Sequence, residues 1–358
     1  MEKKTLYLIC NAHLDPVWLW NMEEGISAAL STFHTAADFC ENYDGFVFNH
    51  NEALLYQWIE EYDLPLFERI QKLVKAGKWH IMGGWYLQPD CNMPSGESFV
   101  RQIRSGQEYF REKFGVTPKT AINFDPFGHS RGLVQILKKA GYHSYLFGRP
   151  SEGDCPLGGD DIIWEGFDGS QILGHRTREG YNSLMGEAGK KVREKLEALR
   201  KEPERTEAIL LWGVGNHGGG PSRQDMADIA KLMENEKEWT IVHGIPEDYF
   251  EKEDTTKLPV IRRDLNPWAV GCYTRYHRRC QQLIIHSFLG IVRPNLEIDR
   301  TIDISLPSNG LYDYRYVEIH RFVRLINESQ SRPLYLFLST LIEAGPIVML
   351  PASWASNT

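Results

Sequence analysis

TLYLICNAHLD, residues 5–15, joins an apolar run to a polar segment that carries a histidine and an aspartate two positions apart. Thr5–Cys10 has the length and the apolar residues of a short buried strand. His13 and Asp15 then lie just beyond the end of that strand, and Trp18 follows three residues later. Parallel α/β folds place their functional sites at the carboxyl ends of their strands. The segment therefore predicts an α/β fold and also the edge of the sheet at which a site is to be sought.

The alternation of strand and helix continues along the chain. Further strands are expected at residues 78–90, 119–130, 143–151, 161–165, 171–175 and 207–222, the last opening into a glycine-rich loop. Helices are expected, from apolar residues at helical spacing, at residues 25–42, 51–76, 98–114, 133–140 and 190–202. This order predicts a parallel β/α barrel-like catalytic domain.

The pattern changes beyond the last of these strands. The polar stretch Asp254–Pro259 is typical of a linker, and the segment after Trp268 has one basic and one apolar face, as an amphipathic helix does. We therefore expect the barrel-like domain over residues 1–253 and the start of a helical bundle over residues 260–358. The tail after about residue 292 is atypical and supports no firm assignment.

The composition argues against several classes of partner. A net charge of −8 without a Lys/Arg cluster argues against nucleic acid and against an anionic membrane surface. No apolar segment approaches the roughly 18 residues of a membrane span, and the amino-terminal residues do not resemble a signal peptide, so a cytoplasmic protein is expected. Six cysteines without a C-x-x-C pair indicate neither a zinc finger nor a disulfide framework. The 10 tryptophans and 16 tyrosines suit stacking on sugars.

The strand expected at residues 119–130 also finishes on an aspartate. This residue is Asp125, within NFDPFGHS, residues 123–130. Pro126 stiffens the backbone just after this carboxylate, and Gly128 permits a tight turn. A carboxylate held rigidly beside a cation stays ionised and points in one direction, as a nucleophile must. The alternative is a helix N-cap, because an aspartate before proline often has that role.

His13, Asp15 and Asp125 together offer one imidazole and two carboxylates. This set suits Zn²⁺ with a coordination position left for water or substrate. Each residue type is common by itself, and it is the joint placement at two strand ends that favours a metal site. Trp18 is expected to serve as a platform for the apolar face of a sugar if it is exposed, or as a core aromatic residue if it is buried.

Four ordered blocks of the sequence resemble glycoside hydrolase family 38, the retaining α-mannosidases. They are NAHLDPVWLW (11–20), GGWYLQPDCNMPSGESFVRQIRSGQEYFREKFG (83–115), NFDPFGHS (123–130) and VGCYTRYHRRCQQ (270–282). The resemblance covers about residues 5–285. It implies a β/α barrel-like domain followed by the start of a three-helix bundle. It also implies one zinc ion held by His13, Asp15 and Asp125, with Asp125 as the nucleophile.

The resemblance implies further contacts with a sugar, less specifically. The residues concerned are Trp18, Phe127, Arg149, Trp268 and Tyr273, with Asp90 and Asn92 shaping the site from a second strand. Arg149 would orient the carboxylate of the nucleophile, and a surface arginine is the alternative. The aromatic residues are equally compatible with simple packing.

The sequence departs from the family pattern in the loop where an aspartate serves as general acid. This chain has Asn216 and His217 there, and Asp225 is the nearest carboxylate. Asparagine cannot donate a proton usefully, whereas histidine can, so His217 is the expected acid.

The carboxyl-terminal part also departs from the family. No His-Asp pair follows residue 285, so neither His286 nor His320 is assigned as the family's fourth zinc ligand. Members of the family continue into β-rich domains that this chain lacks. The resemblance therefore implies a fragment, a degenerate copy or a chain with a shifted reading frame, and does not distinguish among them.

The leading interpretation is a zinc-dependent, retaining, exo-acting α-mannosidase that takes a mannose-containing oligosaccharide or glycoside. A metal-dependent polysaccharide deacetylase is a second interpretation, but it calls for a further histidine pair and no H-x-x-x-H is present. A third is a sugar-binding remnant without catalysis. The linkage, the physiological glycan and the oligomeric state, including a homo-oligomer, stay open.

Overall fold

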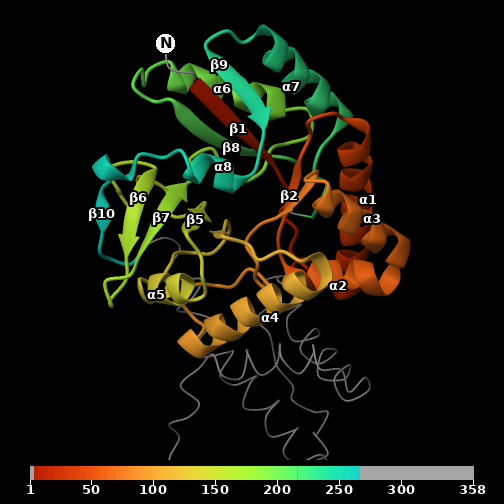
Figure 1. Cartoon of the computed structure of the whole chain (residues 1–358), viewed down its shortest axis with the longest axis horizontal. Coiled ribbons are helices and arrows are strands. Elements are labelled where there is room, and N and C mark those ends of the chain that lie inside the picture. Colours follow the sequence, from red (N-terminus) through yellow and green to blue (C-terminus); the bar gives the residue numbers. More distant parts are fainter. Residues whose placement is uncertain (1–3, 216, 267–358) are drawn as a thin grey trace, which may run out of the picture. The chain divides into compact units, whose positions relative to one another are not determined.

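The computed structural model of the chain describes residues 4–215 and 217–266 (Figure 1). The chain divides into two compact units. The first contains Met1–Cys91 and Phe99–Trp268, and the second contains Asn92–Ser98 and Ala269–Thr358. All the strands below belong to the first unit, which is an α/β structure with two mostly parallel sheets.

The first sheet is built around β1, a buried strand at Lys4–Cys10. The strands of this sheet are β3 (Trp79–Ile81), β2 (Phe48–His50), β1 and β8 (Glu207–Trp212) in that order, with β9 (Trp239–His243) also paired to β1. Every pairing is parallel, and Leu8 of β1 lies opposite Leu210 of β8. The near-continuous burial of β1 and β8 is typical of parallel strands covered on both faces.

The second sheet contains β10 (Val260–Ile261), β6 (Asp161–Glu165), β7 (Gln171–Arg176), β5 (Ser144–Phe147) and β4 (Thr120–Asn123) in that order. Its pairings are parallel except for the antiparallel β6–β7 pair. Apolar residues of both sheets meet in one buried cluster, which includes Ile9, Ile122, Leu146 and Ile209. One backbone bond, from Gly83 N to Thr120 O at 3.0 Å, links the end of β3 to β4.

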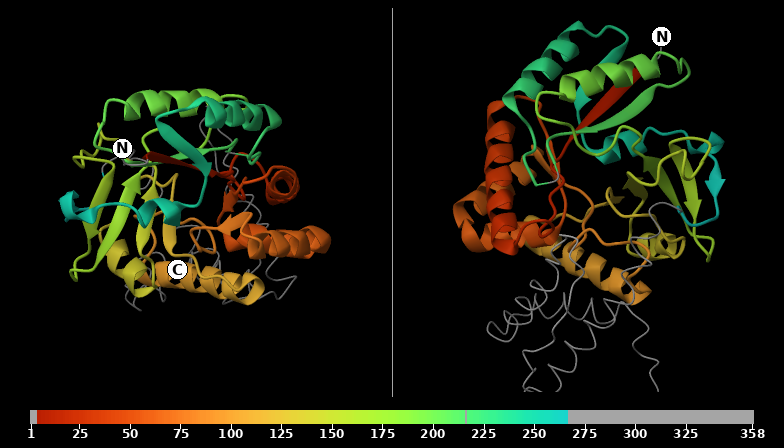
Figure 2. Two further views of the ribbon diagram at one scale, coloured as in Figure 1. Left: turned by 45° about the horizontal axis from the view of Figure 1, so that its top comes forward. Right: turned by 180° about the vertical axis from the view of Figure 1, so that it is seen from behind.

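Helices cover the outer faces of the sheets (Figure 2). They are α1 (Met22–Asn42), α2 (Ala53–Tyr62), α3 (Leu64–Lys75), α4 (Gly96–Phe114), α5 (Gly132–Lys139), α6 (Ala188–Leu199), α7 (Arg223–Asn235), α8 (Pro246–Phe250) and a 3₁₀ turn at Thr255–Lys257. α6 packs on β8, α7 on β9 and α5 on β7, while α1, α2 and α3 pack on one another. Among the helices of the described part of the chain, none is long and apolar enough to cross a membrane.

Several expected elements are shorter than the sequence pattern predicts, since the strands expected at 119–130, 143–151 and 207–222 end at Asn123, Phe147 and Trp212. The single helix expected at 51–76 is divided, because the Asp63 carboxylate accepts the Leu66 N–H and begins α3, with a proline in its first turn. The strand expected at 78–90 ends at Ile81, because Gly83 and Gly84 both adopt φ of +75° and turn the chain out of the extended conformation.

Other elements were not anticipated from the pattern. β2, β9 and α7 lie in stretches for which no element was expected. The expected linker at Asp254–Pro259 contains the 3₁₀ turn, and β10 directly after it pairs with β6. The expected helical bundle falls almost wholly outside the described residues, so the division into residues 1–253 and 260–358 stays a prediction.

Candidate functional site

His13 and Asp15 follow the carboxyl end of β1. Asn11 continues the strand, since its N–H donates to Trp212 O at 2.9 Å. His13 is only 6% exposed, and its Nε2 lies 3.3 Å from Asp15 Oδ1. The chain beyond Asp15 is fixed by Trp20, whose indole N–H donates to the Asp15 carbonyl at 3.1 Å.

Asp125 follows the carboxyl end of β4, and two donors hold its carboxylate. Arg149 Nη1 lies 2.6 Å from Asp125 Oδ1 and also donates to the Asp125 carbonyl at 3.0 Å. The Tyr181 hydroxyl donates to the same Oδ1 at 2.7 Å. These contacts set the direction of the carboxylate, and Arg149 makes the contact expected of it from the sequence.

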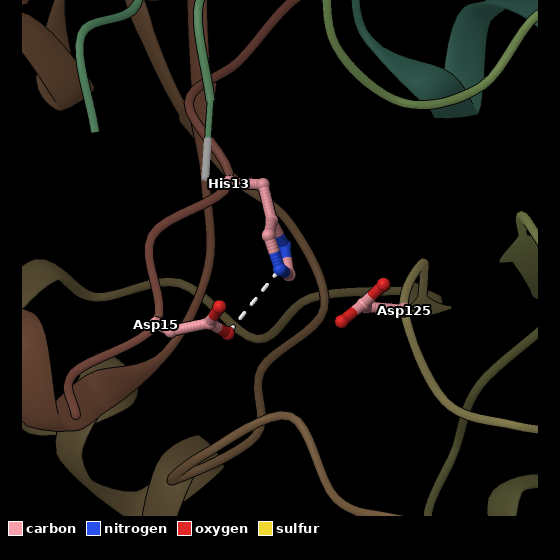
Figure 3. A group of neighbouring side chains, drawn as sticks. All are labelled: His13, Asp15 and Asp125. Atoms are coloured by element: carbon pink, nitrogen blue, oxygen red, sulfur yellow. Dashed lines mark ion pairs between the residues drawn. The ribbon is translucent and has the colours of Figure 1, made fainter. Parts of the chain in front are cut away.

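His13, Asp15 and Asp125, which we call the ligand cluster, point toward one another (Figure 3). One ligand atom from each residue lies within 4.8 Å of the other two. The ligand atoms around one zinc ion lie about 3–4 Å apart, so small side-chain rotations would bring all three onto one ion.

The surroundings of His13 are consistent with a ligand role. His13 Nε2 is buried and makes no hydrogen bond among the described residues. Burial opposes charging of this ring, but the carboxylates of Asp15, Glu52 and Asp125 together outweigh burial and raise the pKa of His13. A buried nitrogen that lacks a hydrogen bond and faces two carboxylates is suited to a divalent cation.

Arg149 is itself held in place by a buried histidine. His129 Nε2 lies 2.6 Å from the Arg149 carbonyl, and His129 Nδ1 lies 2.6 Å from the Tyr145 hydroxyl. Burial lowers the pKa of His129 to about 4, so the ring is neutral at neutral pH. It therefore donates to the carbonyl through Nε2 and accepts from Tyr145 through Nδ1.

Tyr181 is a site residue that the sequence reasoning missed. Besides bonding Asp125, its ring lies 4.7 Å from the His13 ring and stacks on Phe124 at 5.8 Å, so it contacts both halves of the ligand cluster. It lies in the irregular loop between β7 and α6. Its position five residues beyond the end of a strand was the signal that could have found it.

Glu52 and Gln88 were also missed. Among the described residues Glu52 is the one non-glycine residue with positive φ, at +70°, and its buried Oε1 accepts the Gln88 N–H at 3.0 Å. Gln88 Oε1 in turn accepts the N–H of Phe124, next to Asp125, at 2.5 Å. Burial raises the pKa of Glu52 to about 7. The signal for Glu52 was an acidic residue just beyond a short apolar stretch, FVFNH.

Trp18 and Phe127, the two aromatic residues expected to contact sugar that the structure describes, are both partly accessible. Trp18 is 51% exposed and meets Trp20 edge-on, with ring centroids 5.6 Å apart. Phe127 is partly buried, and the Arg149 guanidinium lies over its ring at 5.9 Å. Exposure of Trp18 removes the alternative that it is a core residue.

His217, the expected acid, lies beside the first block of the sequence. Its backbone pairs with Leu14, its ring meets Trp20 edge-on at 3.9 Å, and its Nε2 lies 3.3 Å from Glu24 Oε1. Asp225, the nearest carboxylate in sequence, is fully buried and accepts the N–H groups of Gly186 and Ala188. Asp225 therefore anchors the start of α6.

The remaining expected residues are placed as follows. Asp90 is partly buried in the loop after β3, and Asn92 belongs to the second unit. Asn216, Trp268, Tyr273, His286 and His320 lie outside the described residues.

The chain matches one known protein family over most of the residues that the structure describes. Residues 3–270 match the sequence model described as "Glycosyl hydrolases family 38 N-terminal domain". The chain is 30% identical over 276 residues to alpha-mannosidase G of Dictyostelium discoideum, covering 76% of this chain and 25% of that protein. It is 26% identical over 281 residues to an alpha-mannosidase of Saccharomyces cerevisiae, covering 76% of this chain and 26% of that protein.

The fold has a similar counterpart among solved structures. An alpha-mannosidase from Enterococcus faecalis V583 matches with a TM-score of 0.65 and 23% identity, over 74% of this chain and 31% of that one. The chain thus spans about a quarter to a third of the length of these proteins.

Proposed function

The chain belongs to glycosyl hydrolase family 38, and on that premise we propose that it is the catalytic part of a retaining α-mannosidase that removes terminal α-mannosyl units. The observation that carries the proposal is the convergence of His13, Asp15 and Asp125 within 4.8 Å. The two sheets share one core and are joined by the Gly83–Thr120 bond, and we take them as the barrel-like domain expected of the family.

The ligand cluster is the proposed zinc site. One imidazole nitrogen and two carboxylates form a donor set that zinc accepts, and His13 Nε2 makes no hydrogen bond among the described residues that would compete. A zinc ion bound there supplies a Lewis acid that the neighbouring cis hydroxyls on C2 and C3 of a mannosyl unit can chelate.

Asp125 is the proposed nucleophile. Its carboxylate attacks the anomeric carbon while the bond to the leaving oxygen breaks, which gives a covalent glycosyl-enzyme; water then releases the sugar and restores the carboxylate. Arg149 and Tyr181 hold the carboxylate in one direction, because both donate to Oδ1. Trp18, exposed three residues after Asp15, offers a face for the sugar ring.

His217 is the proposed general acid. A proton on its ring would pass to the leaving oxygen in the first step, and the ring would accept a proton from water in the second. Glu24 lies 3.3 Å from Nε2 and forms an ion pair with the ring when the ring is protonated.

The first experiment measures hydrolysis of an aryl α-mannoside by the 358-residue chain. We expect activity that a chelator removes and added zinc restores, and that Asp125→Asn abolishes. Metal content is measured by mass spectrometry and mannose binding by titration, to distinguish an enzyme from a sugar-binding protein without catalysis. A chain that binds zinc and mannose without turnover would be the sugar-binding remnant instead.

A second experiment tests His217. If it is the acid, His217→Ala slows an aryl mannoside with a poor leaving group far more than a dinitrophenyl mannoside, which needs no protonation. His143→Ala, which alters an exposed histidine just before the start of β5, is the matched control. Equal losses on both substrates would assign the proton donor elsewhere.

A further inference from the structure

Lys191 is a partly buried lysine on α6 whose ammonium group faces main-chain carbonyls. Its Nζ donates to Gly180 O at 3.0 Å, Asn182 O at 2.9 Å and Leu211 O at 2.7 Å. An ammonium group has three donors and these three acceptors use them all. The nearby acidic residue Glu179 pairs with Lys195 at 2.7 Å.

Two of the three carbonyls flank Tyr181 in the chain. One cation that bonds the residues before and after Tyr181 fixes the curvature of the loop at that point and hence the direction of the tyrosine side chain. The carbonyl of Tyr181 is held separately by Asn11 Nδ2 at 2.9 Å. The third acceptor, Leu211 O, belongs to β8, so the loop is tied to a strand rather than to another loop.

We propose that Lys191 is a positioning residue that sets the hydroxyl of Tyr181 on Asp125 by clamping the main chain on both sides of that tyrosine. The inference rests on the proposed function of Asp125. Lys191 does not contact the ligand cluster in the described contacts and acts only through the Tyr181 loop.

The partial burial of Lys191 has a free-energy cost, because the ammonium group is removed from water. Taking an ammonium group out of water disfavours its charged form, and burial lowers the pKa of Lys191 to about 8. Three carbonyl oxygens offset that cost, and each would be left without this donor if the lysine were removed. A chain that only needed to close the loop could do so with a neutral side chain.

The test is a double-mutant cycle on kcat and KM with Lys191→Met and Tyr181→Phe. Each substitution is expected to lower kcat about tenfold, the effect of losing one hydrogen bond to a charged group, with KM changed less than about twofold. Because Lys191 acts through Tyr181, the double variant should be no slower than Tyr181→Phe alone. Multiplied effects would overturn the proposal.

Lys190→Met is the matched control. It makes the same chemical change one residue away, on an exposed lysine paired only with Glu187 in the described ion pairs. Its kcat and KM should equal those of the unaltered chain. If Lys191→Met does not fold, Lys191→Gln, which keeps a shorter, neutral donor, takes its place in the cycle with the same expectation of non-multiplied effects.

A readout without turnover keeps this inference separate from the proposed function. The chain is labelled with 3-fluorotyrosine, and the ¹⁹F signal of residue 181 is identified by its absence in Tyr181→Phe. We expect this signal to shift or broaden in Lys191→Met and to stay unchanged in Lys190→Met. An unchanged signal in Lys191→Met would overturn the proposal even if the enzyme is active, whereas a shifted signal in an inactive chain would leave the clamp supported and only the mannosidase proposal rejected.

Discussion

Asp125 shows how a single side chain depends on residues from several segments. Its carboxylate is bonded by Arg149 from the end of β5 and by Tyr181 from the loop after β7. The carbonyl of Arg149 is bonded in turn by His129, which lies four residues after Asp125. Each of these contacts orients Asp125. Substitutions of Arg149, Tyr181 or His129 should therefore lower kcat more than they weaken the binding of sugar.

Trp18 should contribute to affinity. It is 51% exposed, so Trp18→Ala is expected to leave the melting temperature unchanged and to raise KM about tenfold, the loss of one aromatic face from the sugar. Leu19→Ala, at a neighbouring residue that is 65% exposed, is the control and should change neither quantity. A lower melting temperature with unchanged KM would mean that Trp18 is a packing residue.

His129 should contribute to stability in a pH-dependent way. His129→Leu leaves the Arg149 carbonyl and the Tyr145 hydroxyl without this partner, at a cost of about 2–4 kcal/mol in the free energy of unfolding at pH 7. The folded-state pKa of about 4 lies below the usual value of about 6.5. The neutral ring therefore favours folding above about pH 6.5, and this contribution is lost as the pH falls toward 4.

Urea unfolding at several pH values measures this effect. His143→Leu, at an exposed histidine, is the control and should behave like the unaltered chain. The His129→Leu variant should show a smaller loss of stability between pH 6.5 and 4 than the unaltered chain. An equal loss in both would show that another group titrates.

At the scale of elements, strands with a regular apolar pattern could be predicted from the sequence, whereas the course of the irregular loops could not. β1 and β4 are apolar runs that end in polar residues, so His13, Asp15 and Asp125 could be nominated from sequence. Tyr181 and Gln88 lie on loops whose course depends on contacts distant in the chain, such as Lys191 to Leu211 and Gln88 to Phe124. The local spacing of apolar residues does not predict contacts between residues that are distant in the chain.

Gly106 lies where helix α4 packs closely against the loop after β3, which leaves no room for a side chain. A Cβ at this position of α4 would lie 2.2 Å from Gly84 O and 2.4 Å from the Trp85 carbonyl carbon, both in the backbone of the loop that carries Gln88. Alanine is favoured over glycine in a helix by about 1 kcal/mol. Overpacking against backbone costs about 1–3 kcal/mol, which outweighs that gain.

We therefore expect Gly106→Ala to lower the stability of the protein and, because the displaced loop holds Gln88 against Phe124, to lower kcat as well. Ser105→Ala alters the adjacent residue of the same helix. It gains the higher helix propensity of alanine without the clash and should be neutral or slightly stabilising. Thermal unfolding and kcat of the two variants provide the comparison. Gly106→Ala with raised stability would show that α4 can move away from the loop.

At the scale of the whole first unit, the two sheets are joined by a buried polar group as well as by the shared apolar core. Asp161 at the start of β6 contacts His175 of β7 at 2.6 Å, the Tyr249 hydroxyl of α8 at 2.5 Å and Arg205, which precedes β8. These contacts cross from the second sheet to the first. The α/β class was predictable from sequence, but this junction was not, because its four residues lie in four separate segments.

Asp161 should make the unit sensitive to acid. Burial raises the pKa of this carboxyl, but His175, Arg205 and the Tyr249 hydroxyl outweigh burial and hold the pKa well below its usual range. The ionised group therefore favours folding above about pH 3.9, the unfolded value, and the contribution is lost as the pH falls through the lower folded value. Asp161→Asn should cost about 3–5 kcal/mol at pH 7, since it leaves the Arg205 guanidinium and the buried His175 ring without their carboxylate partner.

Urea unfolding at pH 7 and at pH 3 distinguishes this junction from general acid effects. Asp161→Asn should lose less stability between the two pH values than the unaltered chain does, while Asp44→Asn, at an exposed turn after α1, should match the unaltered chain at both. Because the junction ties the second sheet to the first, zinc added to the Asp161 variant and bound as proposed by the ligand cluster should be released together with unfolding. A variant that is as stable as the unaltered chain at pH 7 would show that the Asp161 junction contributes nothing to joining the sheets.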